Sequence, residues 1–381
     1  MILKREHIIA KVLKLVEDVD KKDGLLSVYV SDGINNVRFV SDSEEEIKAV
    51  RQYFNMLYNV SENKEENYGE IFEVYSIKSK LCNEIIDTFP LVDSDDLFYD
   101  MQGGKVYEDD ELYCLIRKNM LGVTVFLKKE RITIYLRLGD LIENVHLSQV
   151  IKEPINSYKI ANGYMLLHCA ACSYAGKVIV FPAQKYGGKS TIVMGMLCDE
   201  KSKYLGNDSL FIKPEINGIS VMKNPHAIRL GTETINNNLY LRNYLSVKIN
   251  QNKAKMYGAP LVLNNKTQIV SCSLDQIYGS NKIERNGMQI SNFIFPKLIP
   301  NEKINEINMI DNDKAKELLK TCYSIRDHRI NWLPYYKKDL MEKMEQKTLQ
   351  DVLTKMEFDS YELQFDGEID TAVKIITNKI G

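Results

Sequence analysis

Apolar positions in the first part of the chain recur mostly at the spacing of strands, with two helical stripes among them. One stripe runs through residues 4–22 and stops before Gly24, which predicts a helix. Ser43 and Glu46 form a capping-box pattern ahead of a second helical stripe that begins at Ile47. Apolar runs predict strands over residues 25–31, 37–40, 71–77, 106–107, 112–116, 123–127 and 132–136. We therefore expect residues 1–155 to form a β-rich, mostly antiparallel N-terminal domain, with a substrate-docking or a purely structural role.

The pattern changes from residue 156 onward, where strand-like runs and helical stripes both occur. Strands are expected over residues 165–171, 178–181 and 210–212, and shorter strand-like segments continue to Phe295. Pro296, Pro300 and a polar stretch then mark a transition. Beyond it the pattern predicts helices over residues 314–322, 340–356 and 369–376 and a strand over 362–365. Since 381 residues exceed one ordinary domain, we expect residues 156–381 to form a second domain, of the α/β (α+β) class.

A glycine-containing loop joins the predicted strand 178–181 to a helical stripe. A strand, such a loop and a helix form a phosphate cradle, because loop N–H groups and the helix N-terminus point at the anion. A lysine there reaches the terminal phosphates, and the hydroxyl that follows it coordinates Mg²⁺. The pattern requires glycine where this chain has Ala183, so a chance Gly-Gly-Lys-Ser at a turn is the alternative. The predicted nucleotide-binding residues are Gln184, Lys185, Tyr186, Gly187, Gly188, Lys189, Ser190 and Thr191.

Two further side chains are candidates for the same site. Asp208 precedes the apolar run 210–212, and a second Mg²⁺-binding carboxylate belongs at such a strand edge. A turn aspartate is the alternative, because Gly206-Asn207 favours a turn. His168 lies in the apolar run 165–171, and pairing of that run with strand 178–181 would bring the imidazole near the phosphate site. A histidine that only packs in the core is the alternative reading.

Composition narrows the classes of partner. A net charge of −2, from 50 basic and 52 acidic residues, gives no indication of a nucleic-acid or membrane partner. The sequence has no apolar run near the roughly 18 residues of a membrane span and no signal-peptide pattern, so we expect a cytoplasmic location. Seven scattered cysteines do not indicate a disulfide framework. Cys169 and Cys172 have the spacing of a metal or redox pair, but their apolar strand favours core packing.

Taken together, these segments resemble the catalytic domain of HPr serine kinase/phosphorylase and the HPr-kinase-like proteins. The matching residues are Leu167-His168, the strand 176–181, Gly188-Lys189-Ser190-Thr191, Asn207-Asp208 and the segment from Asn224 to Leu230. The resemblance covers residues 160–235, and the run 326–332 is loosely similar to HPr-kinase-like proteins found near peptide-modification systems. It implies a P-loop nucleotide-binding domain with a central β-sheet flanked by helices, and a C-terminal extension.

The resemblance also implies the cofactors and the roles of single residues. ATP and Mg²⁺ would be the cofactors. Lys189 would contact the β- and γ-phosphates, and Ser190 and Asp208 would hold Mg²⁺. His168 would lie near the transferred phosphoryl group.

Three arginines are candidates for the charge on the transferred group. Arg229 lies in the matching segment, and Arg326 and Arg329 lie in the later run, although surface ion pairs are the alternative for each. Asn207 stands where the family has an acid thought to accept the proton of the substrate serine, and an amide lacks that basicity. Thr191 stands where the kinase/phosphorylase has a glutamate, which argues against phosphorolysis.

The function that follows is an ATP-dependent phosphotransferase that acts on a hydroxyl of a peptide or small protein, with a peptide-modification pathway as one setting. A nucleotide-binding regulatory or scaffold protein with impaired catalysis is an alternative that Ala183 and Asn207 favour. A different P-loop ATPase or transferase acting on a small molecule is a third, because a fold does not fix its function. A homo-oligomer is left open.

Overall fold

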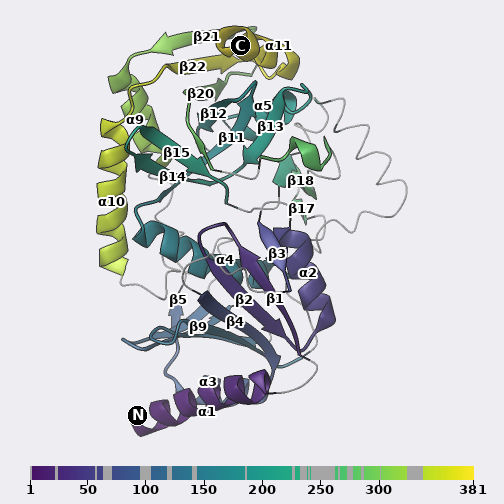
Figure 1. Cartoon of the computed structure of the whole chain (residues 1–381), viewed down its shortest axis with the longest axis vertical. Coiled ribbons are helices and arrows are strands. Elements are labelled where there is room, and N and C mark those ends of the chain that lie inside the picture. Colours follow the sequence, from purple (N-terminus) through teal and green to yellow (C-terminus); the bar gives the residue numbers. More distant parts are fainter. Residues whose placement is uncertain are drawn as a thin grey trace. The chain divides into compact units, whose positions relative to one another are not determined.

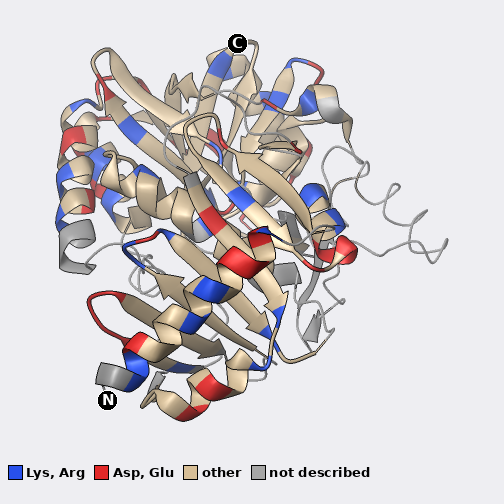
Figure 2. Ribbon diagram, turned by 60° about the horizontal axis from the view of Figure 1, so that its bottom comes forward, with Lys and Arg blue, Asp and Glu red and all other residues tan. Residues whose placement is uncertain are grey.

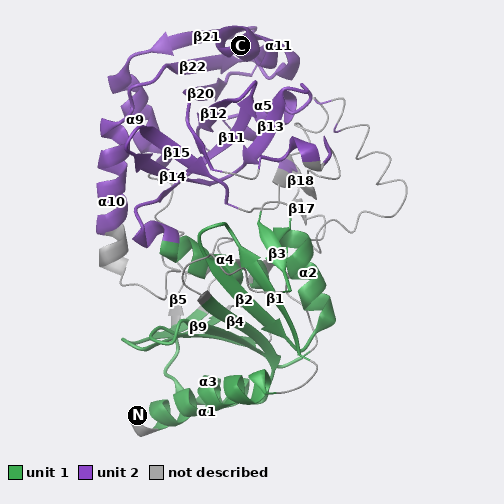
Figure 3. Ribbon diagram, in the orientation of Figure 1, with its two compact units in different colours: residues 1–158, 327–342 green, residues 159–326, 343–381 purple. Residues whose placement is uncertain are grey.

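The computed structural model divides into two compact units, which Figure 3 shows in different colours. Unit 1 comprises residues 1–158 and 327–342, and unit 2 comprises residues 159–326 and 343–381. The structure describes residues 2–21, 25–55, 58–62, 71–94, 104–117, 122–139, 144–184, 187–224, 228–231, 238, 241, 262–264, 267–272, 278–284, 287–300, 302–323 and 338–381. Among these residues, no helix has the length and apolar character needed to cross a membrane.

Unit 1 is built on a nine-stranded mixed sheet with the strand order β3-β1-β2-β4-β9-β8-β7-β6-β5 (Figure 1). The strands are β1 (Leu26–Ser31), β2 (Asn36–Ser41), β3 (Asn59–Ser61), β4 (Ile71–Lys78), β5 (Val92–Ser94), β6 (Gly104–Glu108), β7 (Leu112–Arg117), β8 (Gly122–Leu127) and β9 (Ile132–Arg137). β2, β4 and β9 run parallel in the middle of the sheet, and the pairings on either side are antiparallel. The sheet is thus mostly antiparallel, as expected, with a parallel centre that was not predicted.

The helices of unit 1 are α1 (Ile2–Asp20), α2 (Glu44–Phe54), α3 (Leu81–Thr88) and α4 (Asn144–Ala161). α1 and α3 pack on the sheet through one apolar cluster, in which Val12 and Ile85 meet Val125 and other strand residues. α2 packs against β1 and β2. Ser43 caps α2 as predicted, because its hydroxyl oxygen accepts a hydrogen bond from the Glu46 N–H. The other half of the predicted capping box is not formed, because the Ser43 N–H donates to the Ser41 hydroxyl and not to Glu46.

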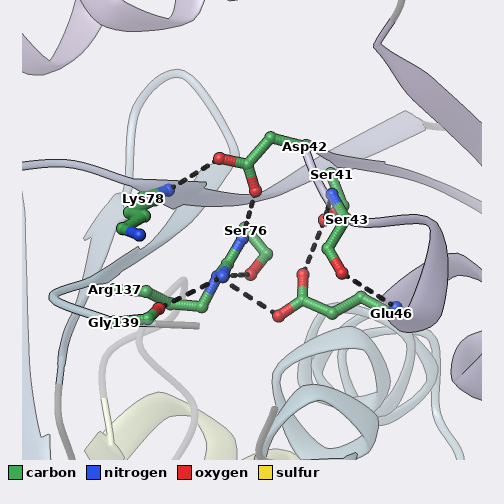
Figure 4. Close-up of polar contacts among 8 residues, drawn as sticks. All are labelled: Ser41, Asp42, Ser43, Glu46, Ser76, Lys78, Arg137 and Gly139. Atoms are coloured by element: carbon green, nitrogen blue, oxygen red, sulfur yellow. Dashed lines mark hydrogen bonds and ion pairs between the residues drawn. The ribbon is translucent and has the colours of Figure 1, made fainter. Parts of the chain in front are cut away.

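A buried polar network lies where the parallel strands β2, β4 and β9 end (Figure 4). The Arg137 side chain is only 4% exposed and forms ion pairs with Asp42 and Glu46. Its Nε lies 3.1 Å from the Ser76 hydroxyl oxygen and 3.2 Å from Glu46 Oε1. Glu46 also accepts a hydrogen bond of 2.6 Å from the Ser41 hydroxyl, and burial raises the pKa of its carboxyl. The network therefore ties the first turn of α2 to the strand ends.

Unit 2 contains three sheets in the part of the chain that the structure describes (Figure 1). The six-stranded sheet has the order β13-β11-β12-β20-β22-β21, the four-stranded sheet β10-β14-β15-β19 and the three-stranded sheet β16-β18-β17. The strands are β10 (Met165–Leu167), β11 (Cys169–Tyr174), β12 (Lys177–Pro182), β13 (Ser202–Gly206), β14 (Leu210–Glu215), β15 (Gly218–Met222), β16 (Ile228–Gly231), β17 (Val262–Asn264), β18 (Thr267–Cys272), β19 (Met288–Gln289), β20 (Asn292–Leu298), β21 (Asn305–Ile310) and β22 (Ser360–Phe365).

The helices of unit 2 are α5 (Lys189–Met196), the 3₁₀ helix η1 (Ser280–Lys282), α9 (Asn312–Tyr323), α10 (Lys338–Thr354) and α11 (Ile369–Ile380). The first residues of α10, 338–342, are assigned to unit 1. α9 and α10 bury Leu319 and Val352 in one core with Val180 and Phe293 of the six-stranded sheet. α5 packs on β11 and α11. The three helices and the strand predicted after residue 313 are confirmed, whereas β21 lies in a stretch expected to be only a polar transition.

The structure is a mixed arrangement of several sheets and helices, consistent with the α+β class. Figure 2 shows basic and acidic residues interspersed on the helices, while most strand positions carry neither charge.

Candidate functional site

β12 leads into the predicted phosphate loop, and α5 begins directly after it. All residues of β12 except Lys177 are buried, in keeping with its place inside the six-stranded sheet. Gly188, the residue before α5, has a φ of 86°, in the left-handed region that favours glycine. The Gln184 carbonyl accepts a hydrogen bond of 3.1 Å from the Gly187 N–H. The predicted order of strand, loop and helix is therefore confirmed.

Two glycines of the loop are required by close approach to other residues. A Cβ added to Gly187 would lie 2.7 Å from the Ala183 methyl carbon, and one added to Gly188 would collide with the Phe365 ring. Ala183 itself does not have a positive φ, so this position does not need the conformational freedom of glycine. The departure of Ala183 from the phosphate-loop pattern is thus compatible with the backbone that the loop adopts.

We expect Gly188→Ala to lower the free energy of unfolding by about 2–4 kcal/mol, from left-handed strain plus overpacking against Phe365. Gly176→Ala is the matched control, because Gly176 has a φ of 84° with no atom near its added Cβ. That control should lose only about 1–2 kcal/mol. Urea denaturation measures both values. Equal losses in the two variants would show that the approach of Phe365 contributes nothing.

Lys189 is the first residue of α5, and its ammonium group is buried against the loop. Its Nζ donates to the carbonyl oxygens of Ala183 at 2.8 Å and Gln184 at 2.9 Å. The Nε2 atom of His168 lies 3.0 Å from the same Nζ. Because an ammonium has no acceptor, Nε2 must accept this hydrogen bond and therefore carries no proton. The lysine, the loop and the histidine thus form one hydrogen-bonded group.

His168 lies at a break between two strands. The predicted continuous strand 165–171 is wrong: β10 ends at Leu167 and pairs with β14, whereas β11 begins at Cys169 and pairs with β12. The expected pairing with the strand before the loop is confirmed, and its first pair, Cys169 with Pro182, places the break next to the loop. His168 is 7% exposed, so it is buried as a core histidine would be, but its ring contacts Lys189, the lysine of the predicted phosphate loop.

Asp208 faces the same histidine from a tight turn. Its Oδ1 lies 3.5 Å from His168 Nδ1, and the Asp208 side chain is 38% exposed. The Ser209 N–H donates to the Asn207 carbonyl at 2.9 Å, and Asp208 between them has a φ of 70°. These two features define a γ-turn of the uncommon kind with a positive φ, a conformation that costs of the order of 1–3 kcal/mol. The turn that the sequence offered as the alternative is thus present, and the carboxylate lies next to His168, while its role as a metal ligand stays a prediction.

The side chains on either side of Asp208 hold that turn in place. Ser190 donates its hydroxyl proton to Asn207 Oδ1 at 2.8 Å. Asn224 Nδ2 donates to the Ser209 hydroxyl at 3.2 Å. Asn207, Ser209 and Asn224 are at most 4% exposed. The turn therefore connects α5 with the segment that follows β15, and sequence reasoning missed these contacts because they join residues far apart in the chain.

The remaining predicted residues are placed only in part. Thr191 lies in the first turn of α5. The backbone of Arg229 lies in β16, but its side chain is outside what the structure describes. Lys185 and Tyr186 are outside the described residues, as are Arg326 and Arg329. The roles proposed for these side chains stay predictions.

The residues present fit a nucleotide and a magnesium ion. The Lys189 ammonium, which a phosphate group requires, is buried against the loop carbonyls of Ala183 and Gln184. Ser190 and Asp208 supply hydroxyl and carboxylate oxygens, which are the donors that Mg²⁺ prefers. Among the described residues, no group of three or more His, Cys, Asp or Glu side chains could hold a metal ion. A magnesium ion here would therefore depend on few protein ligands, as is usual where phosphates supply the others.

Cys169 and Cys172 pack in the core. Cys169 belongs to the cluster that α9 and α10 cover, and a three-residue separation along β11 turns the Cys172 side chain to the other face. Both thiols are fully buried, and burial raises the pKa of Cys172 to about 12. This geometry does not suit a shared metal ion or a redox pair.

The sequence matches no family model. It also matches no curated protein. Among solved structures, the chain is similar to the Hpr(Ser) kinase/phosphatase from Coxiella burnetii, at 10% identity and a TM-score of 0.26. The alignment covers 57% of this chain and 98% of that chain. With so low a TM-score this is a weak structural similarity, and the family resemblance stays a prediction from the sequence.

Proposed function

We propose that this chain binds a nucleoside triphosphate with Mg²⁺ at the loop over residues 183–191 and transfers a phosphoryl group to a hydroxyl of a peptide or small protein. The observation that carries the proposal is a series of contacts in which Lys189 touches His168 and His168 touches Asp208. These residues lie next to two glycines that cannot accept a Cβ. A buried ammonium at the start of a helix, linked through a histidine to a partly exposed carboxylate, is suited to binding a phosphate group.

Lys189 supplies the positive charge for binding. Its ammonium donates to two neutral carbonyl groups, of Ala183 and Gln184. A phosphate oxygen carries charge and accepts a stronger hydrogen bond than a neutral carbonyl does, so it would replace one of them. The N–H groups at the start of α5 add the positive end of the helix dipole.

His168 and Asp208 supply the groups nearest to the reacting atoms. The acceptor oxygen forms its bond to phosphorus as the bond to the bridging oxygen of the nucleotide breaks. The nucleoside diphosphate leaves, and the hydroxyl proton passes to an oxygen of the transferred phosphoryl group or to solvent. Asp208 is exposed enough to meet an ion or an acceptor, and with Ser190 it would hold Mg²⁺, which offsets the charge of the phosphates. His168, unprotonated at Nε2, keeps the Lys189 ammonium aimed into the site. Because positioning and charge supply most of the acceleration in this reaction, a strong base is not required.

We expect Asp208→Asn to lower turnover by about 10²-fold or more while leaving the fold intact. Asparagine tolerates a positive φ as aspartate does, so the change removes the charge and keeps the turn. Asp199→Asn is the matched control, because Asp199 is another turn aspartate of unit 2, where its carboxylate accepts the Lys201 N–H, and it lies outside this site. Transfer of γ-³²P from ATP to serine and threonine peptides measures turnover, and calorimetry measures nucleotide affinity.

The wild-type protein separates this proposal from the alternatives. Nucleotide binding that is followed by labelling of a peptide supports the phosphotransferase. Tight binding without transfer to any peptide or small-molecule acceptor favours a regulatory nucleotide-binding protein. Absence of nucleotide binding would show that the proposal is wrong.

A further inference from the structure

We infer that Asn207 is a positioning residue that sets both oxygen donors of the magnesium site, which rests on the function proposed above. Its amide oxygen holds the Ser190 hydroxyl, and its backbone carbonyl closes the turn that carries Asp208. One residue between the helix and the turn thus binds one potential metal ligand and closes the turn that carries the other.

The first contact fixes the direction of the Ser190 hydroxyl. A serine hydroxyl has one proton and two lone pairs, and Asn207 Oδ1 takes the proton at 2.8 Å. With the proton committed, the lone pairs point away from Asn207 and are free to bind a cation. Asn207 is 4% exposed, so water has little access to compete for the contact. The hydroxyl oxygen is therefore oriented before any ion arrives.

The second contact fixes Asp208. The Asn207 carbonyl accepts the Ser209 N–H at 2.9 Å, and this hydrogen bond closes the γ-turn in which Asp208 has a φ of 70°. A strained turn persists only where its surroundings determine it on both sides. Here Ser190 holds the residue before Asp208, and Asn224 holds the residue after it. Loss of the Ser190 contact would remove the hydrogen bond that holds the side chain of the residue before Asp208.

An amide is suited to this task because it accepts the hydroxyl proton without adding charge. A carboxylate at the same position would also accept the proton, but it would place a second negative charge next to Asp208. Asparagine therefore keeps the geometry and leaves the charge of the site to Asp208. This account predicts that the acceptor oxygen matters and that the amide nitrogen does not.

The test measures Mn²⁺ affinity, by electron paramagnetic resonance, in protein saturated with the non-hydrolysable ATP analogue AMP-PNP. Asn207→Leu, which has a similar shape and no acceptor, should weaken Mn²⁺ binding about tenfold or more. Affinity for AMP-PNP in EDTA should change less than about twofold, because the Lys189 contacts do not involve Asn207. Asn207→Asp, which restores the acceptor, should bind Mn²⁺ at least as tightly as the wild type.

Ser190→Ala completes a double-mutant cycle. It should weaken Mn²⁺ binding by itself, and adding Asn207→Leu to it should cost less than the same change costs in the wild type. Unchanged Mn²⁺ affinity in Asn207→Leu, or weaker binding in Asn207→Asp, would overturn the inference. If the leucine variant does not fold by circular dichroism, Asn207→Asp and Ser190→Ala decide: the first must keep Mn²⁺ affinity and the second must lose it.

The proposed function and this inference fail separately. A wild-type protein that does not bind AMP-PNP contradicts the nucleotide site itself. A wild-type protein that binds AMP-PNP and Mn²⁺, together with a leucine variant that binds both equally well, contradicts only the role of Asn207.

Discussion

Lys189→Ala is expected to weaken nucleotide binding by about ten- to a hundredfold. Hydrogen bonds to a charged group contribute about 1.5–3 kcal/mol, and the substitution removes the buried ammonium that lies among Ala183, Gln184 and His168. Calorimetric titration with ATP and Mg²⁺ measures the change in dissociation constant.

Lys201→Ala is the control for a lost positive charge, because Lys201 is an exposed lysine of the same unit. Its removal should change the dissociation constant less than twofold, since exposed charges are screened. Melting curves of both variants without nucleotide check that the fold is retained. An unchanged dissociation constant in a folded Lys189→Ala variant would contradict the phosphate site.

Arg137→Met is expected to lower the free energy of unfolding by about 3–5 kcal/mol, because it leaves the carboxylate of Glu46 buried without its ion-pair partner. Arg38→Met is the matched control. Arg38 also contacts two carboxylates, of Asp20 and Glu73, but its side chain is 25% exposed. The control should lose about 1 kcal/mol or less. Urea denaturation measures both values.

The loss in Arg137→Met should depend on pH. Burial holds the pKa of Glu46 above its usual 4.5, so the folded protein binds this proton more tightly than the unfolded chain does. Stability from this group is therefore gained as pH falls through the folded pKa towards 4.5 and lost as pH rises. Without Arg137 the pKa should rise further, and the deficit should be smaller at about pH 5 than at about pH 8. A deficit that stays constant would show that packing, and not charge, explains the loss.

Local patterns in the sequence predicted many of the elements but missed α3 and α4 in the first part of the chain. The phosphate loop lies between β12 and α5 as expected, because strand, loop and helix each depend on neighbouring residues. The capping of α2 by Ser43 is local for the same reason. The parallel centre of the sheet in unit 1 was not predictable, since the spacing of apolar residues within a strand does not say which strand lies beside it.

The candidate site was predictable as a set of residues and not as a geometry. His168 and Asp208 were identified, but the apolar run around His168 gave no sign that the chain passes there from one sheet to another. The contact between Ser190 and Asn207 joins positions 17 residues apart in the sequence. The approach of Phe365 to Gly188 joins an early and a late segment of the sequence of unit 2. Such pairings arise from tertiary packing, on which local propensity has no bearing.

The place of β22 limits how this unit can be divided. β22 lies between β20 and β21, and its last residue, Phe365, fills the space beside Gly188. A fragment that ends before residue 360 would carry the whole glycine-lysine-serine motif and still lack the ring against which that motif packs. It would also expose the edge of β20, and bare strand edges promote aggregation. The motif therefore cannot be transferred to another protein without the strand that carries Phe365. Truncation or recombination within the last part of the chain would remove the packing against Gly188.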